Sequence, residues 1–298
     1  MATAREMKLR IKSIKNISQV TRALEAVSAS RVRKAEAAVK ESRPYAEKAW
    51  QVLRHLSAQP ARGNVHPLLE ERESIRHVLA VVVTGDRGLA GAYYSNIVRF
   101  TLERMKQEEA PTSYVVVGRK GRDMLSRQGV NLQAEFSDLP SEPNYSDVSA
   151  IGRLVLDEYL EGRTDMVLLI YTDFVNLMRQ EPRVKQLLPL EVGEPEGRVE
   201  GQWAQSIESE GPQPAYIYEP GQEELVDFIV PRFTQLQVFQ AILEGMASEH
   251  AARMVAMRNA TDNAKELADD LQLDYNKARQ QAITSEMLDI VGGVEAQG

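Results

Sequence analysis

Residues 5–27 read REMKLRIKSIKNISQVTRALEAV, and this stretch decides the fold of the 298-residue chain. Its apolar residues recur in steps of three and four, as on one face of an α-helix: Met7, Ile11, Ile14, Ile17, Val20, Leu24 and Val27. No Gly or Pro occurs before Pro44. At about 1.5 Å of rise per residue, a helix of this length would span roughly 65 Å, more than the diameter of a small domain. Such a helix needs a partner along most of its length.

A second long helix is predicted at the other end of the chain. Between Arg232 and Val291, only Gly245 interrupts the residues that favour a helix. The apolar and small residues again form a narrow stripe: Phe239, Leu243, Met246, Met254, Met257, Ala264, Leu267, Leu271, Ala278, Ile283, Met287 and Ile290. Narrow stripes over many turns are typical of coiled-coil seams. The two ends are therefore predicted to pair as one antiparallel coiled coil, the alternative being that each packs separately on a central domain.

The distribution of charge favours this pairing. Residues 1–50 hold twelve Lys and Arg against five Glu, whereas residues 222–298 hold six Lys and Arg against thirteen Asp and Glu. A basic helix beside an acidic helix gains about 0.2–1 kcal/mol for each exposed ion pair. The basic cluster Arg31, Arg33 and Lys34 has two interpretations. It is either a surface for nucleic acid, anionic lipid or an acidic protein, or a solvated helix face beside an acidic neighbour.

Composition excludes several classes of protein. The chain is 43% hydrophobic with a net charge of −7, as in soluble globular proteins. No run approaches 18 apolar residues, which predicts that no helix crosses a membrane, and no apolar signal-peptide core precedes a cleavage site. The chain has no Cys, so disulfides and thiolate chemistry are excluded, and a reducing cytoplasm suits it.

Strands and helices alternate between the two ends. The run HVLAVVV at 77–83 is too short and too rich in β-branched residues for a helix, so a buried strand is predicted over 76–83. Further elements are predicted as helices at 92–107, 118–128 and 146–161 and as strands at 113–117, 166–171, 184–190 and 215–219. Ser146 or Asp147 would lie near the cap of the third helix. A turn near Glu181-Pro182 would make strand 184–190 antiparallel to the strand before it.

This alternation predicts an α/β fold class, with a long antiparallel coiled coil of the N- and C-terminal helices plus a central Rossmann-like α/β domain whose sheet is mainly parallel. Four segments are predicted: an N-terminal coiled-coil helix at 1–58, the Rossmann-like domain at 75–190, an exposed loop rich in Gly, Pro and Glu at 191–214, and a C-terminal coiled-coil helix at 220–298.

A glycine-rich turn, TGDRGLAG at 84–91, follows the first strand. A dinucleotide's phosphates would bind at this place, because the N–H groups at a helix N-terminus attract anions. The spacing is G-x-x-G-x-x-G rather than the dinucleotide fingerprint, and Asp86 would bring negative charge toward a phosphate. A turn that exposes Arg87 to another protein is favoured over a nucleotide site.

Catalytic patterns are absent from the sequence. The four His residues stand far apart and form no H-E-x-x-H pair, so no metal site is predicted. There is no G-x-S-x-G elbow and no G-x-x-x-x-G-K-[ST] loop. We therefore expect no catalytic residue and no cofactor.

Motifs along the whole chain resemble those of one family, the gamma subunit of bacterial F-type ATP synthases. The similar stretches are IKSIKN at 11–16, VTRALEAVSAS at 20–30, RPY at 43–45, TGDRGLAG at 84–91, MRNATDNA at 257–264 and LDYNKARQQAITSE at 273–286. The last is the most specific. One departure is Ala90, which stands where some members carry Cys, so the thiol switch of chloroplast relatives cannot operate here.

The resemblance implies a rotor without catalytic residues. The paired helices would form the shaft inside a ring of alpha and beta subunits, and the α/β domain would lie near the epsilon subunit and the membrane-embedded c-ring, with one copy per complex. Proton flow would turn the shaft, and its asymmetric faces would drive ATP synthesis in the ring. The expected location is peripheral, on the cytoplasmic face of a bacterial plasma membrane, with no membrane insertion and no nucleic acid bound. The alternative is a non-catalytic coiled-coil adaptor that binds nucleic acid or another acidic partner.

The resemblance also implies which residues contact the beta subunit. Arg279, Gln280 and Thr284 match positions that meet a catch loop, whereas Arg22 and Leu24 match the helix turn near an acidic lever motif. Arg87 is the candidate in the glycine-rich turn. An alternative role for Arg279 is that of an intrahelical partner of Tyr275 or Glu286.

Overall fold

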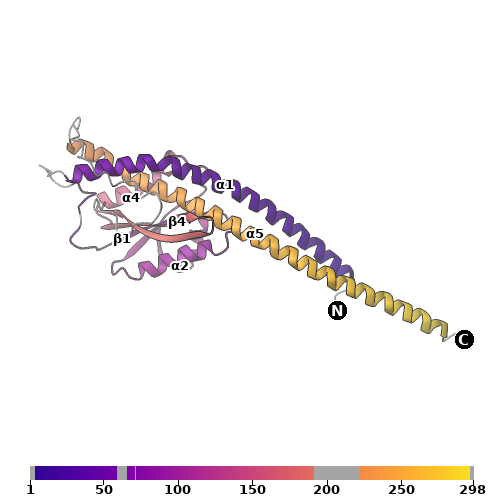
Figure 1. Cartoon of the computed structure of the whole chain (residues 1–298). Coiled ribbons are helices and arrows are strands. Elements are labelled where there is room, and N and C mark those ends of the chain that lie inside the picture. The colour runs from indigo at the N-terminus through magenta and orange to yellow at the C-terminus, as the bar shows by residue number, and fades with distance from the viewer. Residues whose placement is uncertain (1–3, 59–65, 71, 191–221, 296–298) are drawn as a thin grey trace. The chain divides into compact units, whose positions relative to one another are not determined.

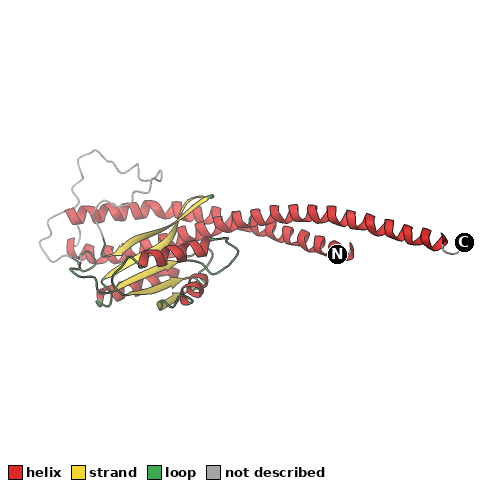
Figure 2. Ribbon diagram, turned by 90° about the horizontal axis from the view of Figure 1, so that it is seen from below, coloured by secondary structure: helices red, strands yellow, loops and turns green. Residues whose placement is uncertain are grey.

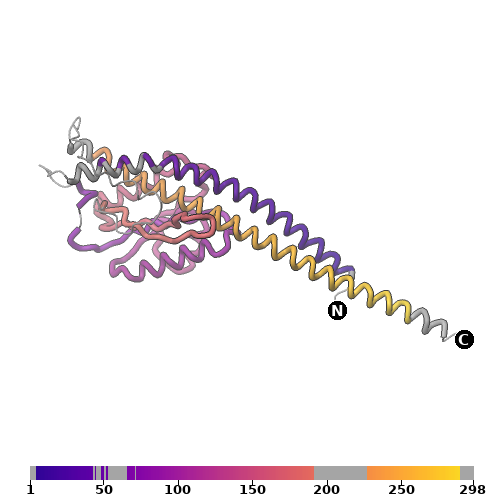
Figure 3. Tube along the Cα trace, viewed as in Figure 1, coloured from indigo at the N-terminus to yellow at the C-terminus, as the bar shows by residue number. Residues whose placement is uncertain are grey.

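The structure is a computed structural model that describes residues 4–58, 66–70, 72–190 and 222–295 (Figure 3). The chain divides into two compact units: Ser30–Ala252, called the central unit here, and Met1–Ala29 with Arg253–Gly298, called the helix pair. The predicted loop at 191–214 and the predicted strand at 215–219 lie outside the described residues.

Two long helices, three shorter ones and a five-stranded sheet make up the fold. The helices are α1 (Ala4–Ala58), α2 (Tyr93–Met105), α3 (Arg119–Ser126), α4 (Tyr145–Leu160) and α5 (Gln222–Glu295), and the strands are β1 (Val78–Val83), β2 (Thr112–Val117), β3 (Asn131–Phe136), β4 (Met166–Asn176) and β5 (Arg179–Leu188). The strand order is β3-β2-β1-β4-β5. The first four strands are parallel and β5 is antiparallel to β4, which confirms the predicted fold class.

The core of the central unit lies on both faces of the sheet. Every residue of β1 is buried, as expected of a parallel strand covered on both sides. Leu79, Val81 and Val83 pack with side chains of α4 and α5, whereas Val78, Ala80 and Val82 pack with side chains of α2 and α3. Figure 1 shows α4 and α5 on one side of the sheet and α2 on the other, and Figure 2 shows the strands from below.

In the central unit one strand was missed and one turn was placed wrongly. β3 was not predicted. Its edge position leaves it only half-buried, with exposed and partly buried residues in alternation. The turn between β4 and β5 lies at Asn176, whose Oδ1 accepts hydrogen bonds from the N–H groups of Met178 and Arg179 at 2.9 Å. Pro182 therefore lies inside β5, where an edge strand tolerates it. The N-cap of α4 is Asn144, and its N–H donates to Asp147 at 2.7 Å.

The two helices of the helix pair run antiparallel. Thr21 Oγ1 lies 2.7 Å from Thr261 Oγ1, and one turn further Arg258 Nε donates to Glu25 Oε1 at 2.9 Å. Because the residue number rises on α1 while it falls on α5, the directions are opposite, as predicted. In Figure 1 the indigo start of α1 runs beside α5, whose yellow end continues beyond it.

The seam between these helices uses smaller and more polar residues than predicted. The buried residues are Ile11, Thr21 and Ser28 on α1 and Arg253, Met254, Met257, Thr261, Ala264 and Ala268 on α5. The hydroxyl groups of Thr21 and Ser28 donate to carbonyls of their own helix, at 3.1 and 2.7 Å, which offsets the cost of burying them. Ala and Ser side chains let the helices approach closely.

Six residues of the predicted seam point outward instead. Ile17, Val20, Val27, Leu267, Ile283 and Met287 are each 49–59% exposed. On α1 the cause is helical geometry: from Ile11 to Val20 the apolar residues follow in steps of three, and nine residues at about 100° each carry the stripe halfway round the helix. Ile17, Val20 and Val27, with the half-buried Leu24, form an outward apolar stripe on α1.

Asp165 anchors the chain that leads into β1. Its buried carboxylate accepts hydrogen bonds from the N–H groups of Arg76 and His77, at 2.8 and 3.1 Å, and from Arg72 Nη1 at 2.9 Å. Arg72 Nη2 also donates to the carbonyl of Tyr159 at 2.8 Å. Burial alone would raise the pKa of Asp165, but the two N–H groups and the guanidinium together hold it below its usual value.

Asp165→Asn is expected to lower the free energy of unfolding of the chain by about 2–3 kcal/mol at pH 7, because the partly buried cation Arg72 loses its charged partner. Since the folded-state pKa is depressed, the stabilisation is present above the unfolded pKa of about 3.9 and is lost as the pH falls through the folded value. Urea unfolding at pH 7 and pH 3 measures both effects. The control is Asp157→Asn on the exposed face of α4. Equal stability of the two variants at pH 7 would contradict this account.

No helix of the described residues is both long and apolar enough to span a membrane.

Candidate functional site

The glycine-rich turn lies where doubly wound folds bind their ligands. It follows the carboxyl end of β1, and the strand order reverses between β1 and β4. In open α/β sheets the crevice at such a switch point is the usual ligand site. The contents of this crevice therefore decide whether the central unit binds a nucleotide.

Hydrogen bonds hold the turn against the start of α3. Thr84 Oγ1 donates to the Val117 carbonyl at 2.6 Å and accepts from the Gly121 N–H at 3.1 Å. The Lys120 N–H donates to the Gly85 carbonyl at 3.0 Å. The turn is thus fixed to the loop between β2 and α3.

Asp86 occupies the place of an anionic ligand. Its carboxylate accepts hydrogen bonds from the N–H of Arg119, the first residue of α3, at 2.9 Å and from the N–H of Asp138 at 3.0 Å. The N-terminus of a helix favours a negative charge. Because the chain supplies that charge itself, this helix end has no need of a phosphate.

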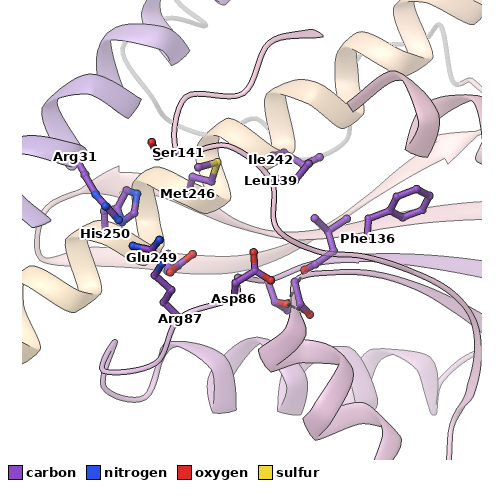
Figure 4. A pocket seen from close by; sticks show the side chains of 14 residues that line it. Arg31, Asp86, Arg87, Phe136, Leu139, Ser141, Ile242, Met246, Glu249 and His250 are labelled. Carbon is purple, nitrogen blue, oxygen red and sulfur yellow. Dashed lines mark hydrogen bonds between the residues drawn. The ribbon is translucent and has the colours of Figure 1, made fainter. Parts of the chain in front are cut away.

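Helix α5 fills most of the remaining crevice. A Cβ added to Gly85 would overlap Glu249 Oε2, so the carboxylate of Glu249 lies directly against the turn. Figure 4 shows Glu249 and His250 of α5 and Arg31 of α1 next to the turn that carries Asp86 and Arg87. The cavity left between them is about 90 Å³, well below the roughly 300–1,000 Å³ of ligand pockets. This geometry disfavours a nucleotide site.

The outer part of the turn presents side chains to solvent. The Tyr94 hydroxyl donates to the Arg87 carbonyl and fixes the backbone there, while the Arg87 side chain is exposed. Leu89 has a φ of +66° and is 64% exposed. A non-glycine residue held in the left-handed region costs of order 1–3 kcal/mol, and such strain clusters at functional sites. An exposed, strained leucine beside an exposed arginine is typical of a protein contact.

The basic cluster is divided between two roles. Lys34 Nζ donates to Glu142 Oε1 at 2.6 Å, with both side chains exposed, whereas Arg31 lines the cavity. Glu249, Leu89 and Arg31 were not predicted as members of this site. Only Leu89 had a signal in the sequence, because it is an apolar residue within the glycine-rich turn. The described residues contain no cluster of His, Asp and Glu suited to a metal ion.

The other predicted contact residues lie in the helix pair. Arg22, Arg279, Gln280 and Thr284 are exposed, and Leu24 is half-buried. Within the described residues Arg279 has no hydrogen bond or ion pair, which disfavours its alternative role as an intrahelical partner. The Thr284 hydroxyl donates to the Gln280 carbonyl at 2.9 Å.

The predicted contact residues of the helix pair lie at two separate positions along it. Arg22 lies beside the buried Thr21, which meets Thr261, whereas Arg279 lies further along α5 by about 27 Å at 1.5 Å per residue. The structure therefore does not bring the predicted contact residues of the helix pair into one cluster.

Comparisons with known proteins agree over the whole length of the chain. A family model described as ATP synthase matches residues 3–297. An ATP synthase gamma chain of Dehalococcoides mccartyi is 44% identical over 298 residues, with 99% of each chain covered. Gamma chains of Roseiflexus castenholzii and Legionella pneumophila are 42% and 41% identical, each with 99% of this chain covered and with 99% and 100% of the relative covered.

Solved structures show the same fold. One chain of the Euglena gracilis mitochondrial ATP synthase, from a structure of its OSCP, F1 and c-ring, superposes with a TM-score of 0.67 and 20% identity, over 99% of this chain and 94% of that chain. One chain from the central stalk and c-ring structure of the Tetrahymena thermophila enzyme gives a TM-score of 0.59 and 22% identity, over 81% of this chain and 99% of that chain.

Proposed function

The chain belongs to the ATP synthase gamma chain family, and from this premise we propose that it is the central-stalk rotor subunit of a proton-driven ATP synthase. In this role it transmits torque from the c-ring to the catalytic sites of the alpha and beta subunits and carries no catalytic residue of its own. One observation supports the proposal above the others. Several large apolar side chains of the helix pair, Ile17, Val20 and Val27 among them, point outward from its seam.

Outward apolar side chains need a protein surface to cover them. Ile17, Val20 and Val27 follow one another along α1 at spacings of about one and two helical turns. A ring of alpha and beta subunits that encloses the helix pair provides such a surface. Because this stripe lies on one face of α1, the three catalytic sites would meet different faces of the pair, and each would be biased by its differential binding energy.

The remaining partners follow from the same role. The α/β domain, residues 75–190, would serve as the base that meets the epsilon subunit and the c-ring. One copy would act per complex, at the cytoplasmic face of a bacterial plasma membrane. A nucleic-acid adaptor has less support, because Lys34 of the basic cluster is engaged with Glu142.

Six residues are proposed to contact the beta subunit: Arg22, Leu24, Arg87, Arg279, Gln280 and Thr284. The exposure of five of them fits this role, and so does the absence of an internal partner for Arg279 within the described residues. The hydrogen bond from Tyr94 to the Arg87 carbonyl fixes the backbone from which the Arg87 side chain extends.

The test of the function is reconstitution. The purified chain should neither bind nor hydrolyse ATP, and it should restore coupled activity to alpha and beta subunits that lack it. Co-purification from the native membrane should bring both subunits with it. Tight ATP binding by the isolated chain would contradict the rotor, and binding of nucleic acid that weakens steeply with salt would favour the adaptor.

Arg279→Ala is expected to weaken binding of the chain to the alpha–beta ring by about 1.5–3 kcal/mol, because a charged hydrogen-bond donor to the beta subunit is lost. Coupled ATP synthesis should fall with it, while the thermal unfolding of the isolated chain stays unchanged. Lys277→Ala is the control, since it removes another exposed cation from the same helix. If the two variants behave alike, the contact role of Arg279 is wrong.

A further inference from the structure

One turn of α5, Gly245–Glu249, is held in the crevice by directional contacts, and it is called the α5 lock here. The Tyr93 hydroxyl of α2 donates to the Gly245 carbonyl at 2.9 Å. The Ser248 hydroxyl donates to the Thr172 carbonyl of β4 at 3.1 Å. Both hydrogen bonds are buried in the central unit, so two elements of the α/β domain grip the same helical turn.

Close backbone approach strengthens this grip. A Cβ on Gly245 would lie 3.0 Å from Val83 Cγ1, so α5 rests directly on the end of β1 at this point. One turn further, the Glu249 carboxylate lies against Gly85. The lock therefore touches α2, β1, β4 and the glycine-rich turn in the space where related folds hold a ligand.

The rest of α5 within the central unit is held mainly by apolar packing, together with an exposed hydrogen bond from the Tyr145 hydroxyl of α4 to Gln235 Oε1 at 2.5 Å. Val230, Phe233, Leu236 and Ile242 belong to the apolar core on one face of the sheet. Apolar packing is non-directional and scales with buried area, so by itself it leaves the angle of a helix about its own axis loosely defined. The two buried hydrogen bonds, to the Gly245 carbonyl and from the Ser248 hydroxyl, restrict that angle because they require particular directions.

We infer that the α5 lock fixes the angle of α5 about its axis on the sheet and carries the torsional load between the α/β domain and the long helix, an inference that rests on the proposed rotor function. Tyr93 and Ser248 act as positioning residues. They contact neither a substrate nor a partner subunit in this role. Weakening the lock leaves the catalytic sites of the ring intact but lets the helix turn relative to the domain.

The test is the double variant Tyr93→Phe/Ser248→Ala, assembled with the other subunits in proteoliposomes. Expected are ATP hydrolysis close to that of the unmodified complex and a fall of about twofold or more in protons pumped per ATP, because both directional restraints are lost. The matched control is Tyr114→Phe/Ser149→Ala. Ser149 donates within its own helix, to the Ser146 carbonyl at 2.8 Å, and Tyr114 lies on β2, so neither change removes a hydrogen bond to the lock.

A second variant covers the case in which the double variant does not fold. The atoms nearest to a Cβ added in Gly85→Ala belong to the far end of the flexible Glu249 side chain, so we expect this variant to fold and to lower the pumping ratio in the same direction. An unchanged ratio in the folded lock variant would overturn the inference alone. Failure of the unmodified chain to restore pumping would instead overturn the proposed function.

Discussion

Gly118→Ala is expected to lower the free energy of unfolding of the central unit by about 3–5 kcal/mol, the sum of backbone strain and overpacking. Gly118 has a φ of +102°, a region that side chains rarely adopt. An added Cβ would lie 2.5–2.7 Å from the backbone N, Cα and C atoms of Gly85. Because those atoms belong to the turn that is hydrogen-bonded to α3, they have little freedom to move.

The control for this variant is Gly129→Ala. Gly129 also has a positive φ, +70°, but a Cβ there would meet no atom within 4 Å. It therefore experiences strain alone and should lose only about 1 kcal/mol. Urea unfolding followed by far-UV circular dichroism measures both variants. If both variants lose a similar free energy of unfolding, the close contact with Gly85 does not contribute to the destabilisation.

The double variant Ile17→Asp/Val20→Asp is expected to weaken binding of the chain to the alpha–beta ring by about 3 kcal/mol, roughly a hundredfold in Kd. Both side chains are about half exposed in the free chain, at 52% and 58%, so their replacement does not disturb the seam. If the ring covers them, each carboxylate loses its hydration without gaining a partner.

Two measurements separate this effect from misfolding. Circular dichroism should show the same helix content in the variant as in the unmodified chain. Asn16→Asp, an exposed position with no part in the apolar stripe, adds a charge to the same helix and should bind almost normally. Tight binding of the double variant would mean that the ring does not cover the stripe, and the rotor geometry proposed for α1 would be wrong.

The architecture could be predicted from sequence because its signals are long or uniform. The run at 77–83 is compatible only with a strand buried on both faces. The two helices of more than fifty residues show the periodicity of apolar residues over many turns. The shorter elements lack such a clear hydrophobic pattern. β3 reads NLQAEF, in which polar residues alternate, and only its pairing with β2 makes it a strand. Pro44 and Pro231 lie inside α1 and α5, although Pro usually marks a helix boundary.

The site was harder to predict because its main contacts join distant segments. The sequence indicates that Asp86 opposes a phosphate, but not that the carboxylate caps α3. Glu249 stands 164 positions from Gly85 in the chain, so no local pattern connects them. The seam was mispredicted for the same reason. The sequence of α1 alone does not say which of two adjacent stripes packs against α5, the one with Ile17 and Val20 or the one with Ser18 and Thr21.

The outward apolar stripe also has a consequence for how the protein is made. A newly synthesised chain exposes Ile17, Val20 and Val27 to water before any partner arrives, and exposed apolar surface promotes aggregation. Free copies would therefore be short-lived in the cell, subject to chaperones and proteolysis. Supply of this chain would then have to keep pace with supply of the subunits that shield it.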